Sequence, residues 1–217
     1  MLVFWVLAKV PDFAGEPAAA RRSLKDVYAL PGIRSVLFVV LAFVLAHNIL
    51  YTYIAAFLAD ARMAERTDLV LLVFGATSLL SIWIVGLWID RRLRELTLLS
   101  TVLFGLSAAV LWLWRDIPMV VYVASGLWGL AFGGCATLFQ TASAKTAGPA
   151  ADLAQSMLVT AWNTAIAGGG IVGGVLLERF GVEAFAPSLL ILLAMTFVTT
   201  LRARSHGFPR RCPAAGG

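Results

Sequence analysis

Residues that could do chemistry are scarce in this sequence, and His47 stands out because an apolar segment surrounds it. His47 lies four residues before Tyr51, and Asn48 lies four residues before Thr52, so a helix would align these side chains in a polar strip. An imidazole changes its charge near neutral pH, so His47 could take up a proton or contact a solute. A lone polar residue inside a helical bundle is also often a hydrogen-bonded packing residue, and both interpretations stay open.

Gln140 and Asn163 are further polar residues within apolar segments. Either amide could hydrogen-bond a solute from the wall of a cavity or hold two helices together. No Asp, Glu, Lys or Arg falls in the middle of an apolar segment. If ion coupling needs a carboxylate, we therefore expect it to lie outside this chain.

The sequence argues against an enzyme. An intramembrane aspartyl enzyme needs two carboxylates in apolar segments, and a serine hydrolase of the GxSxG type would show that motif, which is absent. Cys135 and Cys212 have no CxxC or Cys/His partner that would form a metal site. We expect no catalytic residue, no metal and no cofactor.

The composition is that of a membrane protein. The chain is 60% hydrophobic and 13% charged, and its mean hydropathy is +0.88, whereas soluble domains are roughly 45–50% apolar and about 25% charged. The net charge of +5 could suggest nucleic acid as a partner. The basic residues are scattered between apolar segments rather than gathered on one face, so we expect no nucleic-acid binding.

Six apolar segments are long enough to cross a bilayer at about 20 residues each. We expect an all-α membrane protein with a six-helix transmembrane bundle over residues 33–202, a cytoplasmic connector over 9–32 and a cytoplasmic tail over 203–217. Residues 1–8 fit the end of a preceding transmembrane helix better than a signal peptide, because no basic region precedes their apolar run. The six expected spans are 33–58, 69–89, 96–114, 117–144, 153–177 and 184–201.

The distribution of basic residues predicts the orientation of the bundle. Leaving Lys9 aside, twelve of the 17 Lys and Arg residues fall on one side of the expected spans and four on the other. Since basic residues favour the cytoplasmic side, both termini are expected there, in a multi-pass protein of the inner or plasma membrane. The four on the opposite side are Arg62, Arg66, Arg115 and Arg179.

The expected fifth span carries small and polar residues at helical spacing. Its stripe allows another helix to approach closely, and the third and sixth spans, rich in Leu, Val and Phe, are expected to face lipid. This alternation hints at a repeat of three plus three helices, a construction found in secondary transporters. The stripe consists of Ser156, Thr160, Asn163, Ala167, Gly170 and Gly174, and Gly169 and Gly173 form a GxxxG pair beside it.

The loop between the second and third spans combines a glycine, a carboxylate and several guanidinium groups, at Gly86, Asp90, Arg91 and Arg94. A basic loop of this kind could serve only to set the topology. The spacing also resembles the cytoplasmic loop motif of the major facilitator superfamily, Gly-x-x-x-Asp-Arg-x-x-Arg, although Leu93 stands where the fuller motif prefers glycine. Residues 163–174 and 51–58 are similar to the eleventh and seventh helices of its drug and sugar efflux branch.

The resemblance implies one six-helix half of a twelve-helix transporter whose halves rock about a central site. It implies proton-coupled efflux of a small organic molecule, with His47, Asn48, Tyr51 and Gln140 lining the cavity. Asn163, Gly170 and Gly174 are then expected at the interface between halves. The partners would be the substrate, lipid, protons, and a missing amino-terminal half or a dimer partner.

The motif implies a gate, in which Asp90 accepts hydrogen bonds from the amino-terminal end of the fifth span near Asp152. Two alternatives to an active half-transporter stay open. The chain could be a six-span membrane subunit that works with a separate partner, or a truncated transporter without function. Drugs, sugars and nucleosides are all compatible substrates.

Overall fold

The computed structural model describes Trp5 and residues 23–209. Cys212, the remaining residues of the 1–8 segment, the connector up to residue 22 and the tail from residue 210 lie outside the described residues. The part of the chain that is described is helical and contains no strand, which confirms the expected all-α class. Its elements are α2 (Leu24–Ala29), α3 (Ile33–Thr52), α4 (Ile54–Asp60), η2 (Ala64–Arg66), α5 (Thr67–Trp114), α6 (Pro118–Phe132), α7 (Cys135–Ala147), η3 (Gly148–Ala150), α8 (Ala151–Phe180), η4 (Val182–Ala184) and α9 (Phe185–Arg202).

Within residues 23–209, four helical stretches are long and apolar enough to cross a membrane: Ile33–Thr52, Ala64–Trp114, Pro118–Phe180 and Val182–Arg202. Large apolar side chains also cover the outside of the molecule. Leu79 is 70% exposed and Trp83 is 66% exposed, both on α5. Such an apolar surface suits contact with lipid rather than water.

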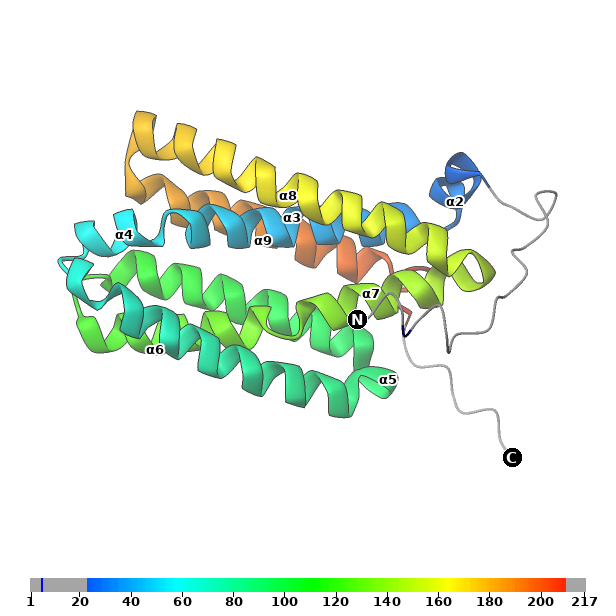
Figure 1. The fold of residues 1–217 in the computed structure, drawn as a ribbon, viewed down its shortest axis with the longest axis horizontal. Coiled ribbons are helices and arrows are strands. Elements are labelled where there is room, and N and C mark those ends of the chain that lie inside the picture. The colour runs from blue at the N-terminus through cyan, green and yellow to red at the C-terminus, as the bar shows by residue number, and fades with distance from the viewer. Residues whose placement is uncertain (1–4, 6–22, 210–217) are drawn as a thin grey trace.

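Two of these stretches bend. A straight helix of 51 residues, the length of Ala64–Trp114, would be about 76 Å long, more than twice the roughly 30 Å hydrocarbon core of a bilayer. Arg92 leaves the helical conformation, with φ −133° and ψ 28°, and α5 turns back on itself there (Figure 1). The chain reverses again at η3, where Gly148 has a positive φ of 54°.

Two expected spans are interrupted inside, which corrects the expectation that each is one continuous helix. The span 33–58 breaks at Tyr53, between α3 and α4, and the span 117–144 breaks at Gly133 and Gly134, between α6 and α7. Ser81 of α5 stabilises the second break. Its hydroxyl donates to the Leu130 carbonyl at 2.6 Å and accepts from the Gly134 N–H at 3.1 Å, so backbone groups released by the break stay satisfied.

Glycines allow the closest helix contacts. A side chain at Gly129 of α6 would collide with the backbone of Phe74 on α5, and one at Gly133, just after α6, would collide with the backbone of Ser78. On α8, a side chain at Gly169 would collide with Asn48 of α3. The GxxxG pair therefore packs α8 against α3 inside this chain.

Candidate functional site

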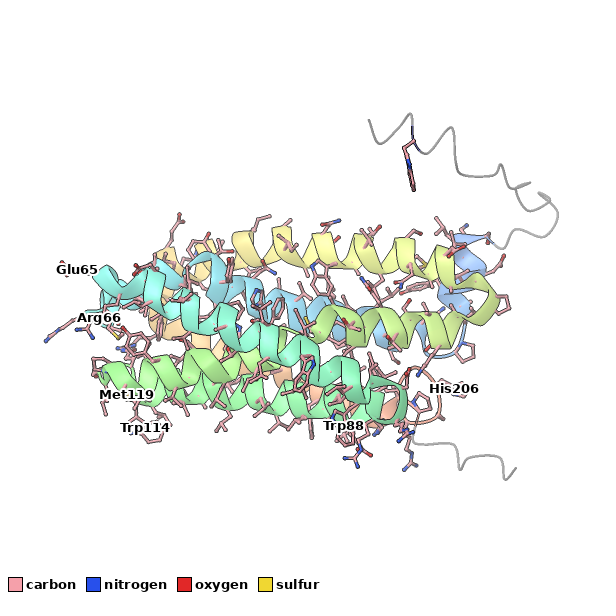
Figure 2. All side chains as sticks on the ribbon, turned by 60° about the horizontal axis from the view of Figure 1, so that its bottom comes forward. Glu65, Arg66, Trp88, Trp114, Met119 and His206 are labelled. Atoms are coloured by element: carbon pink, nitrogen blue, oxygen red, sulfur yellow. The ribbon has the colours of Figure 1, made fainter. Side chains whose placement is uncertain are left out.

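His47 lies in the last two turns of α3 and is 6% exposed. Figure 2 shows α3 lying between α8 and α5 on the face turned to the viewer. The Trp128 indole N–H of α6 donates to Nδ1 of His47 at 3.1 Å. Nδ1 must be unprotonated to accept this bond, so the neutral ring carries its proton on Nε2.

Aromatic rings surround the imidazole. The Phe132 ring is stacked on His47, with centroids 3.3 Å apart and planes 8° apart. Tyr51, one turn further along α3, is stacked on His47 at 5.2 Å and 21°. Phe74 of α5 lies 5.8 Å from the imidazole centroid. Rings from three helices thus hold His47 in place, while Tyr51 is 46% exposed.

The other two predicted cavity residues are placed differently. Asn48 is 9% exposed, and its amide donates to the Val44 carbonyl of its own helix at 2.9 Å. Its Cβ faces Gly169 of α8, so Asn48 serves the helix contact in this structure. Gln140 is exposed on α7. Its backbone carbonyl accepts a hydrogen bond from Gln155 Nε2 at 3.5 Å.

The sequence reasoning did not single out Trp128, Phe132 or Phe74 as partners of His47. Trp128 and Phe132 are four residues apart, a spacing that puts both rings on one side of a helix. This spacing was the available signal. The rotation of α6 that turns the two rings toward α3 is a tertiary feature, which the spacing alone does not predict.

The predicted interface residues of α8 divide into two groups. Asn163 is exposed, together with Ser156, Thr160 and Ala167 of the same stripe. Gly170 and Gly174 are half-buried and lie near Tyr53, the residue between α3 and α4. The Tyr53 hydroxyl donates to the Gly170 carbonyl at 2.7 Å, and a side chain at Gly174 would come 2.8 Å from the same hydroxyl.

A groove of about 550 Å³ runs beside the exposed part of the stripe, between α2, α3 and α8. Ser156, Thr160 and Thr164 form part of its wall, and Leu37 and Leu41 form part of the opposite wall on α3. Part of the stripe therefore borders a groove instead of a flat surface.

Arg94 of the loop motif is buried, with 8% of the residue exposed. Its Nη1 donates to the carbonyls of Thr200 at 2.6 Å and Phe208 at 3.0 Å, and its Nη2 donates to the Leu201 carbonyl at 2.9 Å. Thr200 and Leu201 belong to the last turn of α9, whose carbonyls lack helical partners and attract positive charge. Arg94 thus fixes the carboxy-terminal end of α9 to the bend of α5.

The other motif residues lie at the surface. Gly86 and Arg91 are exposed. The Asp90 side chain is 90% exposed and lies 3.8 Å from Lys145 Nζ, in the last turn of α7. Lys145 is thus the partner that the structure gives Asp90, whereas the sequence predicted the start of α8 near Asp152.

At the opposite end of the bundle, Arg115, between α5 and α6, forms ion pairs with residues at the end of α4 and in η4. Its Nη2 lies 2.7 Å from Glu183 Oε1 and its Nε lies 3.4 Å from Asp60 Oδ2. The hydrogen bond to Glu183, followed by the charges of Asp60, Glu183 and Asp116, raises the pKa of Arg115 above its ordinary value, against an opposing effect of burial. Figure 2 places Arg66 and Met119 at this end, and Trp88 and His206 at the other.

Comparison with curated proteins finds relatives of low identity. The chain is 29% identical over 208 residues, 93% of its length, to the transcription regulatory protein OpdE of Pseudomonas aeruginosa, of which it covers 52%. It is 22% identical over 206 residues, 92% of its length, to a probable sugar efflux transporter of Helicobacter pylori, of which it covers 52%. It is 24% identical over 203 residues, 92% of its length, to the purine ribonucleoside efflux pump NepI of Escherichia coli, of which it covers 51%.

The chain therefore spans about half the length of the curated relatives it matches. No family model matches it. Two of the three relatives bear the names of efflux transporters, and none bears the name of an enzyme. Over most of its length, the chain is thus similar to about half of two proteins that are named as exporters of small molecules.

Proposed function

We propose that this chain is the carboxy-terminal half of a secondary transporter of the major facilitator type, which exports a small organic molecule by alternating access. The observation that carries the proposal is the match of nearly the whole chain to about half of each efflux transporter. Transport then requires a second half, supplied either by a preceding segment or by another copy of the chain.

The bends in the structure support six membrane crossings. The two arms of α5, which meet at Arg92, count as two crossings, and the reversal at η3 separates α6 and α7 from α8. Together with α3–α4 and α9, these segments would make six crossings, the number expected from the sequence. Basic residues then favour a cytoplasmic location for the end that holds Arg94 and Lys145, with both termini on that side.

The exposed stripe of α8 supports a missing partner. Ser156, Thr160 and Asn163 are exposed, although a row of hydroxyl and amide groups facing lipid is unfavourable. A helix of the other half would cover this row. Rocking of the two halves would then open the site at His47 and Tyr51 to one side of the membrane at a time.

Proton coupling is the most demanding part of the proposal. His47 is the candidate proton carrier, and its Nδ1 accepts from Trp128. Protonation of Nδ1 would remove this acceptor, so uptake of a proton would release Trp128 and loosen the ring stack. If His47 instead stays neutral for packing, coupling relies on a carboxylate in the other half.

The experiment that tests the proposal uses everted membrane vesicles with an imposed proton gradient. The chain is expressed alone and together with the first half of NepI, and uptake of radiolabelled inosine and arabinose is measured. We expect gradient-dependent uptake of one solute with both halves present, and its loss on adding a protonophore. Absence of uptake in both preparations would contradict an active half-transporter and favour a truncated chain without function. Uptake by the chain alone would favour a dimer.

A further inference from the structure

A pocket of about 370 Å³ lies where the carboxy-terminal end of α9 meets the start of α3. Its volume falls in the range of small-molecule sites, roughly 300–1,000 Å³. Among the described residues, none of the polar side chains that line it has a hydrogen-bond or ion-pair partner, so their donors are available to a ligand. These side chains are Ser35, Thr199, Arg202, Ser205 and His206.

The segment that follows α9 is packed in place, so the pocket is a fixed feature of the fold. Phe208 is fully buried, and its carbonyl accepts from Nη1 of Arg94 at 3.0 Å. A side chain at Gly32, just before α3, would collide with the backbone of His206 and Gly207. The start of α3 and the segment after α9 are therefore in direct contact, and the wall of the pocket is in position before a ligand binds.

The charge around Arg202 is positive. Arg202 also lines a second pocket of about 410 Å³, together with Arg204. Among the described residues, no Asp or Glu lines either pocket. The two carboxylates of the α5 bend, Asp90 and Glu95, each lie beside another cation, at 3.8 and 3.6 Å. An anion can therefore bind here without repulsion from a lining carboxylate, whereas an ammonium group would find no acidic partner.

An apolar track leads along α9 to Arg202. Ile191, Met195 and Val198 are 63%, 45% and 43% exposed. With Arg202 they follow the spacing i, i+4, i+7 and i+11, which places all four on one face of the helix. Exposed apolar side chains suit contact with an acyl chain, and an arginine at the end of a membrane helix reaches the headgroup level. A phosphate joined to acyl chains meets both requirements.

We infer that Arg202 and the pocket beside it bind the phosphate of an anionic glycerophospholipid, whose acyl chain lies along the exposed apolar face of α9. The guanidinium can donate two parallel hydrogen bonds to a phosphate, and Ser35, Ser205 and His206 supply further donors. Basic pockets at the cytoplasmic side of membrane helices are suited to anionic headgroups. The inference goes beyond the proposed transport function and requires only that α9 crosses the membrane.

Native mass spectrometry of the full chain in detergent micelles tests lipid binding without a transport step. The chain is titrated with phosphatidylglycerol or phosphatidylethanolamine, in the presence and absence of millimolar inorganic phosphate. Arg202→Gln removes the charge, His206→Leu removes the imidazole donor, and Val198→Asn puts an amide on the apolar track. Arg66→Gln is the control, because it removes one exposed charge at the opposite end of the bundle (Figure 2).

We expect phosphatidylglycerol to bind more tightly than phosphatidylethanolamine, whose ammonium group finds no carboxylate. Arg202→Gln should weaken phosphatidylglycerol binding by at least about fivefold, the contribution of one basic residue to anionic-lipid binding. His206→Leu should weaken it by about threefold, for one neutral hydrogen bond. Val198→Asn should weaken it by about threefold, because an amide replaces an apolar group beside the acyl chain. Arg66→Gln should change it by less than about twofold.

Equal weakening by Arg202→Gln and Arg66→Gln would overturn the inference, because it would show attraction to net charge alone. Equal binding of the two lipids would reject an anionic headgroup. Displacement of phosphatidylglycerol by inorganic phosphate, with no effect of Val198→Asn, would assign the pocket to free phosphate and reject the lipid. Arg202 is exposed, so Arg202→Gln should leave the fold intact, which circular dichroism checks. Loss of lipid binding would leave the transport proposal standing, and absence of transport would leave the lipid site standing.

Discussion

Small or short polar residues form two faces of α8, and the surroundings of these two faces differ. Gly169 and Gly173 are buried against α3, where a Cβ atom at Gly169 would collide with Asn48. Ser156, Thr160 and Asn163 are exposed, and Ser156 and Thr160 line a groove. Small residues permit close approach, but another helix must supply the matching surface. The described part of this chain supplies it for one face only, and we assign the other face to a second half.

The largest expected effect on stability comes from Arg94 of the loop motif, whose contacts lie inside the chain. Replacing Arg94 with Met removes three hydrogen bonds to carbonyls of Thr200, Leu201 and Phe208, and we expect it to lower the free energy of unfolding by roughly 2–4 kcal/mol. Unfolding in mixed micelles with increasing dodecyl sulfate measures the change. Arg92→Met is the control, because the Arg92 side chain is 46% exposed. Equal effects of the two substitutions would show that Arg94 does not fix α9.

Substitutions at Gly169 and Gly170 test the difference between the packed face and the open face of α8. A Cβ at Gly169 meets the Asn48 backbone carbonyl carbon at 3.1 Å as well as its Cβ, whereas at Gly170 it meets nothing within 4 Å. We expect Gly169→Ala to cost about 1–3 kcal/mol through overpacking. Gly170→Ala should be neutral or slightly stabilising. The same unfolding measurement checks both, and a neutral Gly169→Ala would mean that α8 does not approach α3 this closely.

A smaller effect is expected at the opposite end of the bundle. Arg115→Gln breaks the ion pairs with Asp60 and Glu183, but the Glu183 side chain is 69% exposed and solvent screens it. We expect a loss of about 0.5–1 kcal/mol that shrinks as salt is raised. Unfolding at low and high salt would reveal it. A loss that ignores salt would point to packing of the Arg115 side chain instead.

The smallest effect is expected on the open face. Thr160→Val removes a hydroxyl that donates to the Ser156 carbonyl at 3.0 Å within the helix, without touching a packed neighbour helix. The free energy of unfolding of the chain alone should change by less than about 0.5 kcal/mol. A large loss of unfolding free energy would show that Thr160 is already part of a contact inside the chain. The distinction between a packed face and an open face of α8 would then be wrong.

Hydropathy predicted the helical class and the bend near Arg92, because each depends on local composition. The breaks at Tyr53 and Gly133 depend on contacts made by α5 and α8 and could not be read from apolar length alone. Helical spacing predicted that His47 and Tyr51 lie together, and their rings do stack. It could not predict that Asn48 turns toward α8 or that Trp128 bonds His47, since both depend on how neighbouring helices rotate.

The loop motif shows the same division. Its spacing left a topology-setting loop and a gate at Asp90 both open, and it did not predict which side chains would be buried. Arg94 is buried because the bend places it over the end of α9, where three carbonyls accept from it. Asp90, four residues earlier, remains exposed beside Lys145. Tertiary geometry, absent from the motif itself, decides this difference.

The most direct test of the central claim is photo-crosslinking from the open face of α8 in intact membranes. Benzoylphenylalanine replaces Thr160 on the stripe or, as the control, Ile191 of α9, which is 63% exposed. The chain is expressed with a differently tagged second copy and with the tagged first half of NepI. We expect position 160 to give a crosslinked product with one of these two partners. Position 191 should give no crosslinked product with either partner. Crosslinking to lipid alone at both positions would contradict the claim that this face receives the other half of a transporter.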